Sequence, residues 1–564
     1  MKHLIIFFLL LAGIHTSYSQ NTVFEWTNRM GGSLFDNGNC ITTDANGNVY
    51  TIGQFQGTVD FDPGAGTANL VAVGQGDIFI QKLDASGNFL WAKQMGGPDS
   101  DFGKSITTDA AGNVYITGSF RETVDFDPGV GTFNLTSAGW DDIFIQKLDS
   151  NGNFLWAKQM GAAGIDAGYS ITLDATGNVY TTGYFEHAID FDPGAGTNIL
   201  TSAGGWDIFI QKLDADGNFI WAKQTGGIDW DNGFSIIIDA TGNILTTGNF
   251  QYTVDFDPGA GTTNLTAEGS WDIFIQKLDA DGNFLWAKQM GGPSEELSAS
   301  IATDTNGNVY ITGYFQGTVD FDPGSETSYL TSSGGLDAFI QKLDVNGNFL
   351  WVKQLGSTGF DEGKSIVVDA NGNVYVTGYF SHTVDFDPGA GVANLTSEGG
   401  ADIFILKLDT NGDFVWANRI GGSEDDTGNC IFIAADGYIF TTGDFRETAD
   451  FDPGPETSNL TSAGLTDIFI LKLSETTLGI PENTFPEKFE VYPNPTNGKF
   501  TIDLGEEYRN ITVEITNIVG QLISSEKYVA TKIVAKEITS SAGIYFVKVA
   551  TTEGLTKTLK LIKN

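Results

Sequence analysis

The sequence predicts an all-β protein: a seven-bladed β-propeller made of 65-residue repeats, followed by a small Ig-like β-sandwich. Three observations lead to this prediction. The segment VDFDPG, or a close variant, recurs seven times without an insertion or deletion, each repeat contains four strand-like segments, and Gly and aromatic residues are abundant. The first Asp of the recurring segment is found at Asp60, Asp125, Asp190, Asp255, Asp320, Asp385 and Asp450.

The four strands of one repeat are expected at residues 40–44, 48–55, 77–83 and 88–95. Short turns containing Gly join the first pair and the last pair, because Gly adopts the positive φ that tight hairpin turns need. The long connection between the second and third strands carries VDFDPG and its Pro-Gly turn. Each sheet is apolar on both faces, so one repeat cannot bury its own surface and the array must close.

The two ends of the array complement each other. Residues 24–26 align with a fourth strand, whereas residues 467–473 align with a third strand. The last repeat therefore lacks a fourth strand, and the N-terminus has one to spare. Pairing the two would close the ring and cover an exposed sheet edge.

The repeats also resemble a known family. One stretch of sequence is similar to the bacterial SBBP-type β-propeller repeat: DIFIQKLDASGNFLWAKQMGG followed by SITTDAAGNVYITGSF. The resemblance extends over residues 24–473. It implies the propeller fold. It implies no single activity, because that family has none assigned.

The N-terminus is typical of a secretory signal peptide. Lys2 gives a basic start, an apolar run follows at 4–11, and Ser17 and Ser19 are the small residues expected before a cleavage site. No later stretch is long and apolar enough to predict a transmembrane helix. The predicted segments are a signal peptide at 1–19, the propeller at 20–474, a polar linker at 475–488 and the β-sandwich at 489–564.

The C-terminal module resembles the type A sorting domain of type IX secretion. This resemblance implies the type IX machinery as a partner, passage across the outer membrane of a Gram-negative bacterium, and a location on the cell surface or outside the cell. The alternative is a generic Ig-like sandwich used for adhesion. The residues that match the sorting motif are Tyr492, Pro493, Asn494, Pro495, Gly520, Gly543, Tyr545 and Lys548.

The charge of the chain argues against nucleic acid as a partner. The formal net charge is −42, whereas nucleic-acid binding needs clustered Lys and Arg. Residues 489–564 hold nine Lys and Arg against eight Asp and Glu, so the negative charge lies upstream of them. Cations, sugars or proteins are the expected partners of a monomeric propeller.

An acidic residue recurs in the loop between the fourth strand of one repeat and the first strand of the next. These loops and those carrying VDFDPG are expected on one face, which would give that face a negative potential. Oxygen-rich clusters suit Ca²⁺, the one cofactor considered; the alternative is that each carboxylate caps a turn through backbone N–H groups. The recurring acids are Asp36, Asp101, Asp166, Asp231, Glu296, Asp361 and Asp426.

Four tryptophans depart from the repeat pattern, and all lie in or beside loops on the same predicted face. Exposed, clustered Trp side chains can stack on sugar rings or anchor a protein. The alternative is that they pack against the long loops. They are Trp140, Trp206, Trp230 and Trp271.

The two cysteines of the chain occupy one repeat position, in the first and last repeats. Cys40 and Cys430 stand where the other five repeats have Ser. They become neighbours if the ring closes, and a disulfide would lock that closure after export. Two buried thiols are the alternative.

The leading functional hypothesis is a surface-exposed binding or adhesion module for carbohydrate or protein. His187 and His382 are the only histidines after the signal peptide, so a Ser-His-Asp triad or a His-rich metal site is not expected, and we predict no enzyme. The alternatives are a structural surface or matrix component and a propeller-fold hydrolase or lyase.

Overall fold

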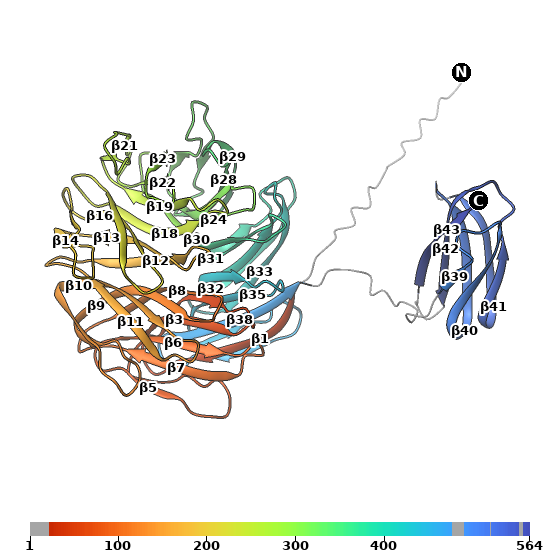
Figure 1. Ribbon diagram of the computed structural model, residues 1–564, viewed down its shortest axis with the longest axis horizontal. Helices are drawn as coiled ribbons and strands as arrows, with labels where there is room; N and C mark the ends of the chain where they lie inside the picture. Colours follow the sequence, from red (N-terminus) through yellow and green to blue (C-terminus); the bar gives the residue numbers. More distant parts are fainter. Residues whose placement is uncertain (1–21, 476–489, 519–520, 552–555) are drawn as a thin grey trace, which may run out of the picture. The chain divides into compact units, whose positions relative to one another are not determined.

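The computed structural model describes residues 22–475, 490–518, 521–551 and 556–564 (Figure 1). Within these ranges the protein consists of strands joined by turns and loops, and it contains no helix that could span a membrane. The chain divides after Glu475 into two compact units, which are described separately. The predicted signal peptide, almost all of the predicted linker and Gly520 lie outside the described residues.

The first unit is built from antiparallel sheets of four strands, as in the blades of a β-propeller; the sixth sheet along the chain also pairs with the hairpin of the following repeat and so has six strands. The first sheet has the order β2-β3-β6-β7. The predicted strands were placed within three residues of the observed ends. The strands of this sheet are β2 (Asn37–Thr43), β3 (Val49–Phe55), β6 (Asp77–Leu83) and β7 (Phe89–Met95).

The following sheets repeat this order along the chain. They are β8 (Phe102–Thr108), β9 (Val114–Asp125), β10 (Asn134–Leu148) and β11 (Phe154–Met160); β12 (Ala167–Leu173), β13 (Val179–Phe185), β16 (Asp207–Leu213) and β17 (Phe219–Thr225); β18 (Asn232–Ile238), β19 (Ile244–Phe250), β22 (Asp272–Leu278) and β23 (Phe284–Met290); β24 (Glu296–Thr303), β25 (Val309–Phe315), β28 (Asp337–Leu343) and β29 (Phe349–Leu355); β30 (Glu362–Val368), β31 (Val374–Asp385), β32 (Asn394–Leu408) and β33 (Phe414–Gly422); and β34 (Thr427–Ile433), β35 (Ile439–Phe445), β38 (Asp467–Glu475) and β1 (Thr22–Met30).

The long connection in each repeat folds into a short hairpin, which the sequence prediction missed. In the first repeat β4 (Thr58–Asp60) pairs with β5 (Asn69–Val71) around the Pro-Gly turn. In two repeats the hairpin is continuous with the long strands β9 and β10, or β31 and β32. The other hairpins are β14 (Ala188–Asp190) with β15 (Ile199–Thr201), β20 (Thr253–Asp255) with β21 (Asn264–Thr266), β26 (Thr318–Asp320) with β27 (Tyr329–Thr331), and β36 (Thr448–Asp450) with β37 (Asn459–Thr461).

The third strand of each sheet is largely buried over its DIFIQKL-like segment, because a neighbouring sheet covers each face. All seven residues of β6 are buried, including Ile78, Phe79 and Ile80. One hydrophobic cluster joins Ile52 and Ile80 of the first sheet to Ile116 of the second. The core of this unit therefore lies between sheets.

Polar contacts connect successive sheets at a fixed offset along the chain. Lys82 Nζ donates to the Ser150 carbonyl of the next sheet (2.9 Å), and Lys472 of the last sheet donates to the Ala85 carbonyl of the first (2.9 Å). The Ile171 N–H donates to Ser105 Oγ (3.3 Å). At the corresponding place between the last sheet and the first, the Ile41 N–H lies 3.4 Å from Cys430 Sγ.

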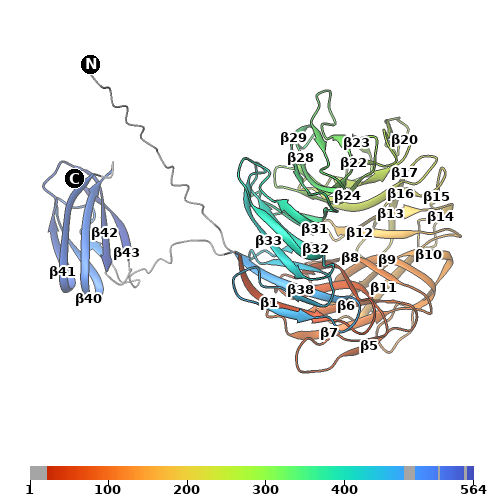
Figure 2. The same cartoon turned by 180° about the vertical axis from the view of Figure 1, so that it is seen from behind.

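The N-terminal strand completes the last sheet. β1 pairs antiparallel with β38 from Thr22 opposite Glu475 to Met30 opposite Ile468. Figures 1 and 2 both show β1, in red, beside β38, in blue. This pairing satisfies the backbone groups of β38 that would otherwise form a free edge.

The second unit is a small antiparallel β-structure with its own core. β40 pairs with three strands, β39, β41 and β42, and β43 pairs with β42. Ile502, Val513 and Val547 are among the buried residues of its hydrophobic cluster. The strands are β39 (Glu490–Tyr492), β40 (Lys499–Asn517), β41 (Leu522–Glu537), β42 (Gly543–Thr551) and β43 (Thr556–Lys563).

Deleting residues 22–30 is expected to lower the midpoint of thermal unfolding by several degrees and to promote self-association, because the edge of β38 becomes free. Adding a synthetic peptide of residues 22–31 should restore the midpoint. The same peptide carrying Asn28→Pro should not, because Asn28 lies opposite Ile470 and Pro has no N–H to donate. Calorimetry and size-exclusion chromatography measure both effects, and a truncated chain that melts like the full chain would contradict the role of β1.

Candidate ligand-binding site

The recurring loop acids are buried in every repeat. Asp36 is fully buried, and it accepts the Gly32 N–H on Oδ2 (2.7 Å) and the Gln56 N–H on Oδ1 (2.9 Å). The same two backbone bonds recur at Asp101, Asp166, Asp231, Asp361 and Asp426. Each carboxylate ties the loop that precedes a first strand to the end of a second strand.

Glu296 is the exception to this pattern. Its Oε2 accepts the Gly292 N–H (3.1 Å), whereas Oε1 is buried without a partner. The longer side chain displaces the second oxygen, and the Gln316 N–H donates to the Glu295 carbonyl instead (3.2 Å). The aspartate of the other repeats therefore fits the loop better.

Burial raises the pKa of these acids, against the lowering effect of their backbone hydrogen bonds. The pKa of Asp101 rises to about 7, and that of Asp231 to about 8. A second buried acid at the start of a third strand adds repulsion, as Asp77 does for Asp101. These loops therefore carry less negative charge near neutral pH than their composition suggests.

The geometry favours turn capping over calcium binding for these acids. In the described residues no three His, Cys, Asp or Glu side chains gather where a metal ion could bind. The oxygens that Ca²⁺ would need are already occupied by backbone donors at six of the seven positions. A calcium site at Asp36, Asp101, Asp166, Asp231, Glu296, Asp361 and Asp426 remains an untested prediction.

One cavity in the first unit gathers a single repeat position from all seven sheets. It has a volume of about 310 Å³, and Leu297 and Glu362 also line it. Neighbouring first strands such as β2 and β8, or β12 and β18, contact each other around it. The repeat position varies from sheet to sheet, and it holds Asn39, Lys104, Tyr169, Phe234, Ala299, Lys364 and Asn429.

An aromatic row leads from this cavity to the surface. Ring centroids are 5.2 Å apart for Phe234 and Tyr169, and 5.6 Å apart for Tyr169 and Tyr184. Tyr184 stacks on Trp206 at 4.4 Å, and Trp206 stacks on Trp230 at 5.5 Å. Trp230 is 49% exposed, so the row ends at the surface.

The four predicted tryptophans do not form one patch. Trp206 and Trp230 belong to the aromatic row, whereas Trp140 is 59% exposed and lies over the Arg121 guanidinium, 4.7 Å from the ring centroid. Trp271 stands one repeat after Trp206 and is not part of the row. The sequence prediction missed Tyr169, Tyr184 and Phe234 because strand residues were interpreted as core. The variation at their repeat positions was the signal that could have identified them.

The two cysteines lie together where the last sheet meets the first. Cys430 Sγ is 3.4 Å from Cys40 Sγ, and both are free thiols in the structure. A hydrogen bond from the Cys430 thiol lowers the pKa of Cys40, which favours the thiolate that disulfide exchange requires. The predicted disulfide remains untested.

The sorting-motif residues hold the end of the second unit together. Asn494 Nδ2 donates to the Lys560 carbonyl (2.7 Å) and its Oδ1 accepts the Ile562 N–H (2.9 Å). Tyr545 donates to the Ser541 carbonyl (2.7 Å). These contacts give the motif a structural role at the last strand.

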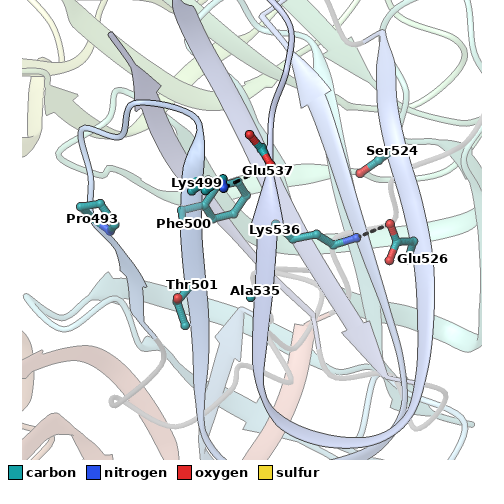
Figure 3. A pocket seen from close by; sticks show the side chains of 9 residues that line it. All are labelled: Pro493, Lys499, Phe500, Thr501, Ser524, Glu526, Ala535, Lys536 and Glu537. Carbon is teal, nitrogen blue, oxygen red and sulfur yellow. Dashed lines mark ion pairs between the residues drawn. The ribbon is translucent and has the colours of Figure 1, made fainter.

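The second unit has a cavity of about 510 Å³ between β40 and β41 (Figure 3). Lys536 Nζ pairs with Glu526 Oε1 at 2.7 Å, and Lys499 Nζ pairs with Glu537 Oε2 at 4.0 Å. Its charged groups are therefore already matched, and we assign no ligand to it.

Comparison with known families identifies both modules. The SBBP beta-propeller repeat matches residues 90–119, 155–184, 285–314 and 350–379, and the secretion system C-terminal sorting domain matches residues 490–564. The chain therefore contains β-propeller repeats and a type IX sorting domain, as the sequence resemblance predicted. The sorting domain indicates a secreted protein and the type IX machinery as its partner.

Two curated proteins are similar over most of this chain. An uncharacterized WD repeat-containing protein of Acanthamoeba polyphaga mimivirus is 26% identical over 484 residues, which are 71% of this chain and 34% of that protein. Regulatory protein FlaEY of Caulobacter vibrioides is 22% identical over 460 residues, 77% of this chain and 45% of that protein. The chain spans less than half the length of either relative.

Among solved structures, Sqt1 from Chaetomium thermophilum is 10% identical with a TM-score of 0.38, covering 81% of this chain and all of that one. A puromycin hydrolase mutant is 11% identical with the same TM-score, covering 84% of this chain and 59% of that one. Both are too distant to bear on function.

The buried acids predict that stability falls as pH rises from about 4 to about 8. Their pKa values in the folded chain, about 7 for Asp166 and about 8 for Glu296, exceed the ordinary value near 4. Between these pKa values folding takes up protons, so the stabilisation is fully present below about pH 4 and is lost as pH rises from about 4 to about 8. Calorimetry should show a midpoint several degrees higher at pH 6 than at pH 8.5, with no change on adding Ca²⁺. A large rise with Ca²⁺ at pH 8.5 would instead establish the calcium alternative.

Thiol labelling of the denatured chain tests the cysteine pair. Oxidation by a disulfide-bearing oxidant would join Cys40 and Cys430 Sγ, with two electrons and two protons leaving to reduce the oxidant. We expect no reactive thiol in protein exported to an oxidising compartment, and two after reduction. Two reactive thiols before reduction would contradict a disulfide between Cys40 and Cys430.

Proposed function

Because the chain joins β-propeller repeats to a secretion sorting domain, we propose that it is a surface-exposed or released binding protein whose seven sheets close into one ring around a saccharide site. The aromatic row from Phe234 to Trp230 carries this proposal. The sorting domain would deliver the propeller through the type IX machinery, and the monomer would act outside the cell.

Three contacts support a closed, seven-bladed ring. β1 pairs with β38, which joins the N-terminus to the last sheet. Lys472 reaches the Ala85 carbonyl with the geometry that other sheets use for their successors. One cavity touches the same position of all seven repeats, which is expected of a central channel.

The row suits a saccharide better than a flat protein surface. The apolar faces of sugar rings stack on Trp and Tyr side chains. The Trp N–H and the Tyr hydroxyl can then form hydrogen bonds. The adjoining cavity of about 310 Å³ is at the small end of ligand pockets. Stacking of Trp206 between Tyr184 and Trp230 fixes its ring, which lowers the entropy lost on binding.

The cavity offers little for hydrolysis. Glycoside hydrolysis needs two carboxyl groups with different roles, whereas Glu362 is the one carboxylate among the cavity residues described. It pairs with Lys364 Nζ at 2.8 Å and accepts the Tyr379 hydroxyl at 2.9 Å. This arrangement favours binding over catalysis.

Trp230→Ala and Trp206→Ala are each expected to weaken saccharide binding tenfold or more, while the melting midpoint of Trp230→Ala changes little because Trp230 is half exposed. A glycan array screened with the full exported chain identifies the ligand, and titration calorimetry measures the change. Trp140→Ala is the matched control, since that ring is at least as exposed as Trp230 but lies outside the row.

Retention of binding in both row variants would place the site elsewhere. Absence of any saccharide ligand on the array would favour the structural alternative, a surface or matrix component without a small ligand.

A further inference from the structure

Lys104 differs from the lysines around it because its ammonium group has no ion-pair partner within the described residues. Its ammonium lines the cavity, 4.9 Å from the centroid of the Phe102 ring and 5.4 Å from that of Tyr169. Among the described residues, no carboxylate lies within ion-pair distance of it and no acceptor bonds it. Burial lowers the pKa of Lys104.

Other lysines of the first unit have an ion-pair or hydrogen-bond partner. Lys364, at the same repeat position on another sheet, pairs with Glu362 at 2.8 Å. Lys82, which recurs in the third strand of every repeat, donates to a carbonyl of the next sheet. Lys104 replaces residues such as Asn39 and Tyr169 of other repeats, so the fold does not require a cation there.

A partly buried cation without an ion-pair partner has lost part of its hydration, so a negatively charged ligand would offset that cost. We infer that the saccharide bound by the aromatic row is acidic, with a carboxylate on Lys104 Nζ and its ring against Tyr169 and Phe234. This inference rests on the proposed function, because the row supplies the stacking surface. A charge-assisted hydrogen bond would then select the acidic sugar over a neutral one.

The net charge of the chain, −42, does not prevent a saccharide carboxylate from binding to Lys104. Exposed charges farther than about 8 Å are screened at physiological salt. The single cavity carboxylate, Glu362, is neutralised by Lys364. Two of the loop acids, Asp231 and Glu296, are buried and have a pKa raised to about 8, so near neutral pH they are largely protonated.

Acidic oligosaccharides and their methyl esters distinguish recognition of the charge from recognition of the ring shape. Oligosaccharides containing glucuronate, galacturonate, mannuronate or sialate are each titrated into the full exported chain beside their methyl esters, which keep the rings and lose the charge. At least one acid should bind about tenfold more tightly than its ester. Lys104→Met should reduce the acid to the affinity of the ester and leave the ester unchanged, and Lys104→Arg should retain the preference.

Lys93→Met, on the outer strand β7, is the control for a general loss of positive charge and should leave the preference intact. Equal binding of every acid and its ester by the unaltered chain would overturn the inference, as would an equal loss of both in Lys104→Met. Trp230-dependent binding of neutral glycans alone would overturn it and leave the proposed function standing. No binding of any saccharide would overturn both.

Discussion

Each blade sheet is apolar on both faces, and this constraint governs the first unit. A strand such as β6, buried over all seven residues, is stable only between two neighbouring sheets. The repeats must therefore stack, and the stack needs a partner for each end. β1 meets that need by pairing with β38. The constant 65-residue period follows, because contacts such as Lys82 with Ser150 recur at one offset along the chain.

The same constraint divides the repeat into two kinds of position. Residues that hold strands and turns recur along the chain, and Asp36 with its two backbone donors has counterparts in five of the other six repeats. Residues that face the cavity have no packing role to preserve, so they vary from Lys104 to Ala299. The varied positions converge because first strands contact each other around the cavity. Symmetry thus provides the scaffold, and departures from it provide the site.

The sequence predicted the sheets well because alternation, turn glycines and an invariant period are local signals. The hairpin of β4 and β5 was missed because its strands have three residues each. For the loop acids the sequence left calcium binding and turn capping as alternatives, because their burial depends on backbone donors from two loops, such as Gly32 and Gln56, that no local pattern brings together. The row from Tyr169 to Trp230 likewise depends on contacts between side chains of neighbouring sheets.

A symmetrised chain tests the central claim most directly. In it, the varied cavity and row positions of every repeat carry the residues of the first repeat, which has Asn39 and Gln54 there, while all other positions are unchanged. Its melting midpoint and its glycan-array binding are measured beside those of the original chain. The account predicts a similar midpoint and no binding. A chain that fails to fold, or one that still binds the same glycan, would contradict the separation of fold and function.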